Sequence, residues 1–127
     1  MSQFTATAPN GQVLVRNTKS HTYNYAVIIM ETADTITARL SGWIARNEKE
    51  IAKYTELGTN EGYVARITKE NAKNAKTIAT VADTWFDIAW RRDLASAQQE
   101  ANKMQESINK GYHNASKVMV VETTQTK

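Results

Sequence analysis

The sequence predicts an α+β protein built on a small antiparallel sheet. The chain begins with residues that alternate like strands, continues with apolar residues at helical spacing, and returns to strands around one further helix. Helices that are grouped between strands, instead of alternating with them, favour an antiparallel sheet. At 127 residues, we expect a single domain, 1–127, in which a helical hairpin is inserted at about 32–81 and one more helix packs on the sheet.

The first strands are predicted from two stretches. "FTATAPNGQVLVR" has a Pro-Asn-Gly turn signal between two β-prone runs, which is typical of a β-hairpin. In "HTYNYAVIIM", alternation would place every second side chain on one face of the next strand. Those side chains are Tyr23, Tyr25, Val27 and Ile29.

The inserted hairpin is predicted from a change of period after Thr32. Apolar residues from Ile36 to Leu57 recur at spacings of three and four, and Gly58 stands where a helix commonly ends. A second helix follows through "VARITKENAKNAKTIATV", but its apolar stripe is thin and includes asparagines. Two helices joined by "LGTNEG" form a helical hairpin.

The segment "TWFDIAWRRDLA" predicts a strand over Thr84–Arg91 and then a helix with Asp93 as its N-cap. That helix keeps a regular apolar spacing and ends at Gly111, before a last strand, "KVMVVETT". Regular alternation would place Trp90 on an aliphatic face with Phe86 and Ile88, so we expect Trp90 in the core.

The opposite face of this strand would carry Trp85, Asp87, Ala89 and Arg91. An exposed indole can stack on a purine base, and guanidinium groups bind phosphate oxygens in a bidentate manner. This combination predicts a nucleotide-binding surface. The alternative is that Trp85 packs under the helical hairpin and that Asp87 pairs with Arg91.

Composition excludes several functions. The chain has no cysteine and two histidines, and we find no metal-ligand spacing and no nucleophile or phosphate-loop motif. We therefore expect no enzyme activity, no metal and no cofactor. No apolar run is long enough to span a membrane, and the first residues do not resemble a signal peptide. The net charge of +3 is mildly basic and suits an anionic partner.

The hairpin offers two further interpretations. Arg66, Lys69, Lys73 and Lys76 fall along one side of the second helix, where they could follow a nucleic-acid backbone. They could equally form a solvated face or pair with acidic residues of the preceding helix. Separately, Trp43, Tyr54 and Tyr63 give the hairpin apolar surface that suits a homo-oligomer or contact with a host protein.

Three segments also resemble a known family: Thr7–Ile29, the Trp85–Ala95 stretch with its "WRRDLA" ending, and the closing "VMVVET". They are similar to the phage Thoeris anti-defence sponges of the first described type. The resemblance implies a phage protein that acts in the host bacterial cytoplasm. It would sequester cyclic ADP-ribose isomers made by TIR-domain proteins without breaking a bond. It also implies a homo-oligomer, and some members hold cyclic oligonucleotides at separate sites.

The resemblance carries four ligand-binding positions over to this chain: Arg16, Tyr23, Trp85 and Arg92. Arg91 joins them from the strand interpretation alone. His21 and Tyr25 depart from the family pattern and are not carried over. The predicted function is sequestration of a cyclic nucleotide signal. Inhibition of a host defence protein by direct contact and binding of nucleic acid are the alternatives.

Overall fold

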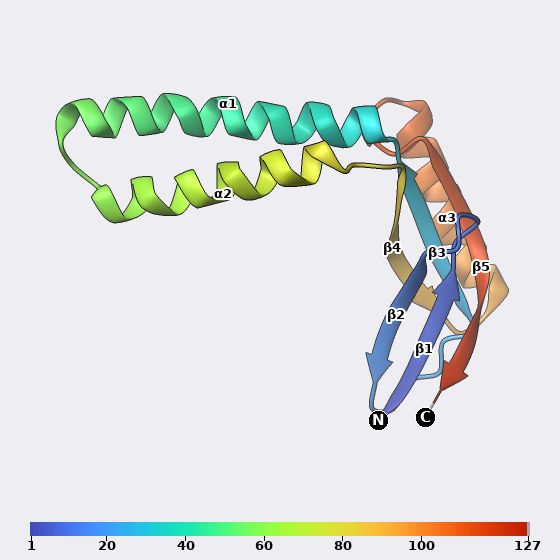
Figure 1. Ribbon diagram of the computed structural model, residues 1–127. Coiled ribbons are helices and arrows are strands. Elements are labelled where there is room, and N and C mark those ends of the chain that lie inside the picture. Colours follow the sequence, from blue (N-terminus) through green and yellow to red (C-terminus); the bar gives the residue numbers. More distant parts are fainter. Residues whose placement is uncertain (127) are drawn as a thin grey trace. The chain divides into compact units, whose positions relative to one another are not determined.

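The computed structural model describes residues 1–126. The chain forms two compact units (Figure 1). The first joins Met1–Thr32 to the segment from Asp83 onward, and the second is Ala33–Ala82. The second unit is the hairpin, and the first holds every strand.

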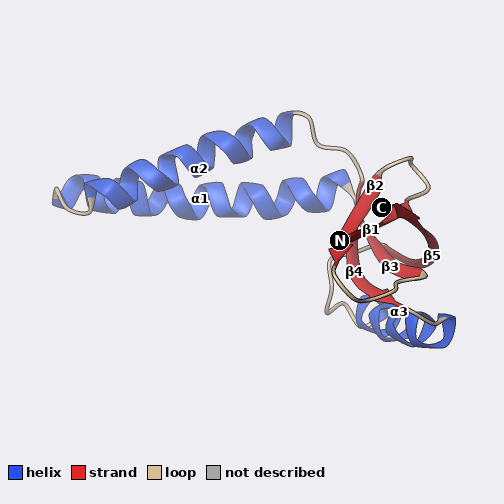
Figure 2. Ribbon diagram, turned by 90° about the horizontal axis from the view of Figure 1, so that it is seen from below, coloured by secondary structure: helices blue, strands red, loops and turns tan. Residues whose placement is uncertain are grey.

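The first unit is an antiparallel five-stranded sheet in the order β2-β1-β5-β3-β4. Helix α3 covers one face of the β3-β4-β5 part of that sheet (Figure 2). The α+β prediction is therefore confirmed. The elements are β1 (Ser2–Thr7), β2 (Val13–Thr18), β3 (Tyr25–Glu31), β4 (Thr84–Arg91), α3 (Leu94–Asn109) and β5 (Lys117–Thr126).

Strand β5 belongs to both halves of the sheet. Its first residues, Lys117–Glu122, pair with β3, whereas Thr123 to Thr126 pair with β1. Each half is therefore three strands wide, and β5 is the strand that they share. The sheet is curved (Figure 2). Apolar side chains, including residues of β1, β3 and β4, form a buried cluster on one of its faces.

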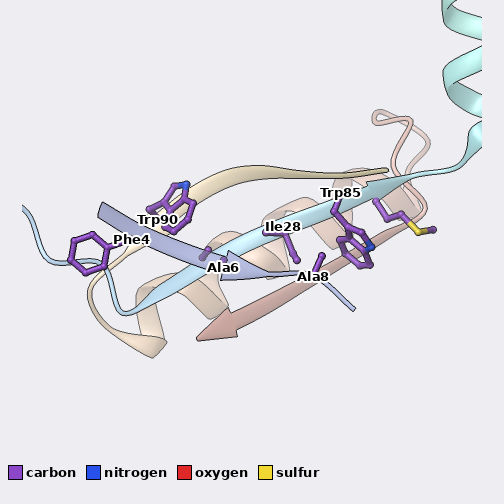
Figure 3. Packing of buried hydrophobic residues seen from close by; sticks show 8 residues of the cluster. Phe4, Ala6, Ala8, Ile28, Trp85 and Trp90 are labelled. Carbon is purple, nitrogen blue, oxygen red and sulfur yellow. The ribbon is translucent and has the colours of Figure 1, made fainter. Parts of the chain in front are cut away.

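The core has one apolar layer on each side of β3. Toward β1, the buried side chains are Phe4, Ala6, Ala8, Ala26, Ile28, Met30, Trp85 and Trp90. Figure 3 shows Phe4 and Trp90 near one end of this cluster and Ala8 and Trp85 near the other. Toward α3, Val27 and Ala89 pack against Ala97 and Ala101. Because both faces of β3 are covered, its side chains are buried without alternation.

Strand β4 contains a β-bulge that sequence alternation does not anticipate. Val27 pairs with Ala89, but the next residue, Ile28, pairs with Asp87, so Ile88 is the extra residue. The bulge exchanges the faces beyond it. Trp85 and Trp90 consequently lie in the same apolar cluster, and Ala89 lies on the α3 side. The prediction that Trp85 shares a face with Ala89 and Arg91 is therefore wrong.

Two other expectations about strand faces need correction. Phe86 and Ile88 were expected in the core with Trp90, but both are more than a third exposed. Tyr23 precedes β3 and packs against the Phe4 cluster, whereas Tyr25 packs on the α3 side. Tyr23 therefore does not share the face of Tyr25 and Val27.

The predicted turns and caps are present. Gly11 has φ of 90°, and the Ala8 and Gln12 backbones are hydrogen-bonded across the turn that joins β1 to β2. Asp93 caps α3 by accepting a hydrogen bond from the Ser96 N–H at 2.7 Å. Gly111, with φ of 76°, follows the end of the helix.

The hairpin unit consists of α1 (Ala33–Leu57) and α2 (Glu61–Ala79), which lie side by side and antiparallel (Figure 1). Its seam is partly polar, because the Asn47 side chain donates to Asn71 Oδ1 at 3.0 Å and Asn71 donates to the Ile44 carbonyl. The asparagines that thin the apolar stripe of α2 thus face the partner helix. Within residues 1–126, no helix is long and apolar enough to cross a membrane.

Candidate functional site

A pocket of about 280 Å³ lies between the two edge strands, β2 and β4. Arg16 lines it from β2, and Tyr23 lines it from the loop before β3. The remaining wall is the consecutive stretch Asp87–Arg91 of β4, which includes the bulge. Three of the five predicted ligand-binding residues therefore line one pocket, namely Arg16, Tyr23 and Arg91.

The two edge strands are joined at the other end of β4 by a side-chain amide. Gln12 Nε2 donates to the Trp85 carbonyl at 2.7 Å, and the Trp85 N–H donates to Gln12 Oε1 at 2.9 Å. The amide thus pairs with the β4 backbone as a strand residue would. It fixes the β1–β2 turn on β4, while the space between the strands stays open at Arg16.

Arg16 and Tyr23 contact each other at the pocket. The Arg16 guanidinium carbon is 5.9 Å from the centroid of the Tyr23 ring, a cation–π distance. Tyr23 also packs edge-on against Phe4 and stacks with His21, with ring centroids 5.7 and 5.8 Å apart. Within residues 1–126, no carboxylate forms an ion pair with Arg16. Its charge is therefore available to an anion.

Arg91 is held by its surroundings. Its Nη1 donates to the Trp90 carbonyl at 3.0 Å, and its Nη2 lies 3.4 Å from Glu100 Oε1 of α3. The side chain is 37% exposed. Because Glu100 already neutralises part of its charge, Arg91 can bind an anion only in competition with that carboxylate.

Asp87 is the acceptor of the pocket. Its Oδ2 accepts a hydrogen bond from Trp90 Nε1 at 2.8 Å, which holds the carboxylate beside the pocket wall. A carboxylate has several lone-pair sites, so Asp87 can still accept from a second donor such as a hydroxyl or an amino group. Sequence analysis placed Asp87 on the predicted binding face without a ligand role and assigned Trp90 to the core, because only the bulge brings these two side chains together.

The other two predicted site residues do not line this pocket. Trp85 is 5% exposed and packs in the apolar cluster, so neither face of its indole is free to stack on a base. The Arg92 side chain is exposed beyond the end of β4, and its backbone carbonyl accepts from Asn24 Nδ2. The alternative interpretation is right that Trp85 packs and is not exposed, but Trp85 packs in the sheet cluster with Phe4. The expected Asp87–Arg91 pair is wrong, because Arg91 pairs with Glu100.

The pocket combines groups that recognise different parts of a nucleotide. Guanidinium groups bind phosphate, the Tyr23 ring offers aromatic surface, and Asp87 can accept from a ribose hydroxyl. In the described part of the chain, no group of three or more His, Cys, Asp or Glu side chains could hold a metal ion. The side chains that line the pocket are therefore suited to binding a nucleotide.

The basic row of the hairpin is a separate surface. Arg66, Lys69, Lys73 and Lys76 are all exposed, and across residues 1–126 none of them pairs with a carboxylate. Arg66 lies over the Tyr63 ring, 5.1 Å from its centroid. Of the interpretations left open by the sequence, pairing with acidic residues of α1 is not observed.

No protein-family model, no curated protein and no solved structure matches this chain.

Proposed function

We propose that the protein is a non-catalytic sponge that sequesters a cyclic nucleotide immune signal, a cyclic ADP-ribose isomer, in the pocket between β2 and β4. The observation that carries the proposal is the convergence of Arg16, Tyr23 and Arg91 on one pocket. These residues come from separate segments of the chain. All three lie in segments that resemble the phage sponges, and for Arg16 and Tyr23 the resemblance also implies a ligand-binding role.

The ligand would use each group of the pocket in turn. Its pyrophosphate would bind Arg16 first, because no carboxylate within residues 1–126 pairs with Arg16, and would then compete with Glu100 for Arg91. A ribose hydroxyl would donate to Asp87, and the purine would lie against Tyr23. Retention of the signal needs only tight binding and slow release, so no reacting group is required.

The size of the pocket bears on the state of assembly. At about 280 Å³ it is slightly smaller than the range of about 300–1,000 Å³ that is usual for small-molecule pockets. One pocket would therefore enclose part of the ligand, and a homo-oligomer would cover the part that extends from it. Binding of the ligand would then stabilise the oligomer, and assembly of the oligomer would strengthen binding of the ligand.

The test is calorimetric titration of ligand-stripped protein with individual cyclic ADP-ribose isomers, followed by chromatography of the ligand. We expect saturable binding to wild type and recovery of the ligand unchanged. Arg16→Ala should weaken binding, whereas Arg46→Ala, the same change at an exposed position of the hairpin, should not. Absence of saturable binding for every isomer, or conversion of the ligand during incubation, would contradict the proposal.

A further inference from the structure

A second binding feature lies on the opposite side of β3 from β4, along strand β5. Lys117–Glu122 pair with β3 on one side, but β1 pairs only with the part of β5 that begins at Thr123. Within residues 1–126, no strand therefore pairs with the outer edge of Lys117–Glu122. An interior strand of the sheet is thus a free edge over half of its length.

The free edge presents backbone hydrogen-bonding groups. In an antiparallel ladder, alternate residues turn their N–H and C=O groups toward the same neighbour. The Thr123 N–H bonds to the Asn24 carbonyl on the β3 side. Counting back by two from Thr123, Val121 and Met119 also face β3, so the backbones of Val118 and Val120, which alternate with them, face away from β3. Both residues are half-buried, and half-buried backbone groups need hydrogen-bond partners.

The edge lies in a groove made of two adjoining hollows of about 390 and 320 Å³. Gln105, Val118 and Met119 line both hollows, so the two are continuous. Toward the concave core the wall is apolar, with Trp85 and Pro9. Toward α3 the wall carries side-chain amides, from Gln98, Asn102 and Gln105. The groove thus has different chemistry above and below the edge.

The charge of the groove has one sign. Lys117 lines it at the start of β5, and among the described residues no carboxylate lines either hollow. Within residues 1–126, Lys117 forms no ion pair. An occupant that completes the groove would therefore carry an acidic group beside Lys117.

From these observations we propose that the groove binds an extended acidic peptide segment of a partner protein, which adds a strand antiparallel to β5. The site is distinct from the Arg16 pocket. Residues of the segment opposite Val118 and Val120 would exchange backbone hydrogen bonds with them and point their side chains to the amides of α3. The residue opposite Met119 would point to Trp85, and an acidic residue would lie opposite Lys117.

A second copy of β5 is a poorer occupant for a physical reason. The free edge ends at Thr123, where β1 begins to pair, and α3 borders the groove along its length. A strand that carried its own β1 and α3 would bring those elements against these walls. A short segment without flanking structure avoids that conflict.

The probe is the peptide acetyl-Val-Thr-Val-Thr-Asp-amide, whose threonines would lie opposite Val120 and Val118. Nuclear magnetic resonance of the full chain should show saturable shifts of the Val118 and Val120 amides. N-methylation of both threonines should weaken binding at least tenfold, because it removes the donors that face β5. N-methylation of both valines should leave affinity within about twofold, since their N–H groups face solvent.

Side-chain chemistry gives an independent check. Lys117→Glu should weaken the peptide at least about fivefold, whereas Lys19→Glu, a matched change at an exposed position outside the groove, should not. Both variants should bind the cyclic nucleotide like wild type, which separates this proposal from the first. Failure of the peptide to saturate, equal binding of the two N-methylated peptides, or shifts confined to other elements would overturn the proposal.

Discussion

The indole of Trp90 donates a hydrogen bond to Asp87, three residues earlier on the same strand, at 2.8 Å. On a regular strand these two side chains would point to opposite faces of the sheet and could not meet. The extra residue Ile88 between them removes that obstacle. One bulge therefore does two things: it buries both tryptophans in one core, and it brings the Asp87 carboxylate to the Trp90 indole at the pocket wall.

The first prediction concerns the charge of Arg16. Arg16→Ala should weaken binding of the cyclic ADP-ribose isomer by about 10- to 100-fold, because a charge-assisted hydrogen bond contributes about 1.5–3 kcal/mol. Arg91→Ala should cost less, since Glu100 already shares its guanidinium. Calorimetric titration measures both. A larger effect at Arg91 than at Arg16 would place the anion nearer to α3 than we propose.

The second prediction separates packing from binding at Trp85. Trp85→Ala should destabilise the protein by about 3–5 kcal/mol, the usual cost of removing a buried tryptophan. Trp85→Phe should cost less and keep the cyclic nucleotide affinity of wild type, because the side chain does not line the Arg16 pocket. Denaturant unfolding and titration of the phenylalanine variant are the measurements. Loss of affinity in a stable Trp85→Phe variant would restore Trp85 as a ligand contact.

The fold class could be predicted because each element has a local signal. Asp93 caps α3, Gly11 turns the chain between β1 and β2, and the apolar spacing marks α1. The bulge at Ile88 has no such signal, since neither glycine nor proline marks it. An error of one residue in register exchanges the two faces of a strand, so the predicted faces of β4 were wrong beyond that point.

The part of the candidate site that lies outside β4 could be predicted from the sequence. Arg16 and Tyr23 lie outside β4, and their place does not depend on its alternation. Trp85 was misassigned because an aromatic residue on a strand has the same pattern whether it faces ligand or core. The free edge of β5 could not be predicted from the sequence, because it depends on where the pairing between β1 and β5 ends.

A third prediction concerns the amide that joins the edge strands. Gln12→Ala should destabilise the protein by about 1–3 kcal/mol, because it leaves the part-buried backbone groups of Trp85 without partners. Gln12→Glu should be as harmful at neutral pH, since the introduced carboxylate can accept from the Trp85 N–H but opposes its carbonyl. Chemical unfolding across pH tests this.

The direction in which the stability of Gln12→Glu changes with pH follows from the loss of the amide N–H donor. Only the protonated form of the introduced carboxyl can donate to the Trp85 carbonyl, so folding should raise its pKa. The loss of stability of Gln12→Glu relative to wild type should therefore become smaller as the pH falls below about 5. The deficit of Gln12→Ala should show no such recovery. Parallel curves for the two variants would mean that the amide does not bond the carbonyl in solution.

The last prediction concerns the hairpin, where the Tyr63 hydroxyl donates to Glu50 Oε2. This hydrogen bond is the main cause that raises the pKa of Tyr63 above its ordinary value of 10.0, and desolvation adds to it. A raised folded-state pKa means that the stabilisation is present below pH 10 and is lost as the pH rises through the folded-state pKa. The stability difference between wild type and Tyr63→Phe should therefore vanish at high pH.

Two measurements check this. Thermal unfolding followed by helical circular dichroism gives the stability difference, and tyrosinate absorbance gives the titration of Tyr63 by difference from Tyr63→Phe. Glu50→Gln keeps an acceptor but removes the neighbouring negative charge, so the pKa of Tyr63 should move back toward its ordinary value. A Tyr63 titration that is unchanged by Glu50→Gln would show that the two side chains do not interact in solution. The seam of the hairpin would then depend on Asn47 and Asn71 for its polar contacts.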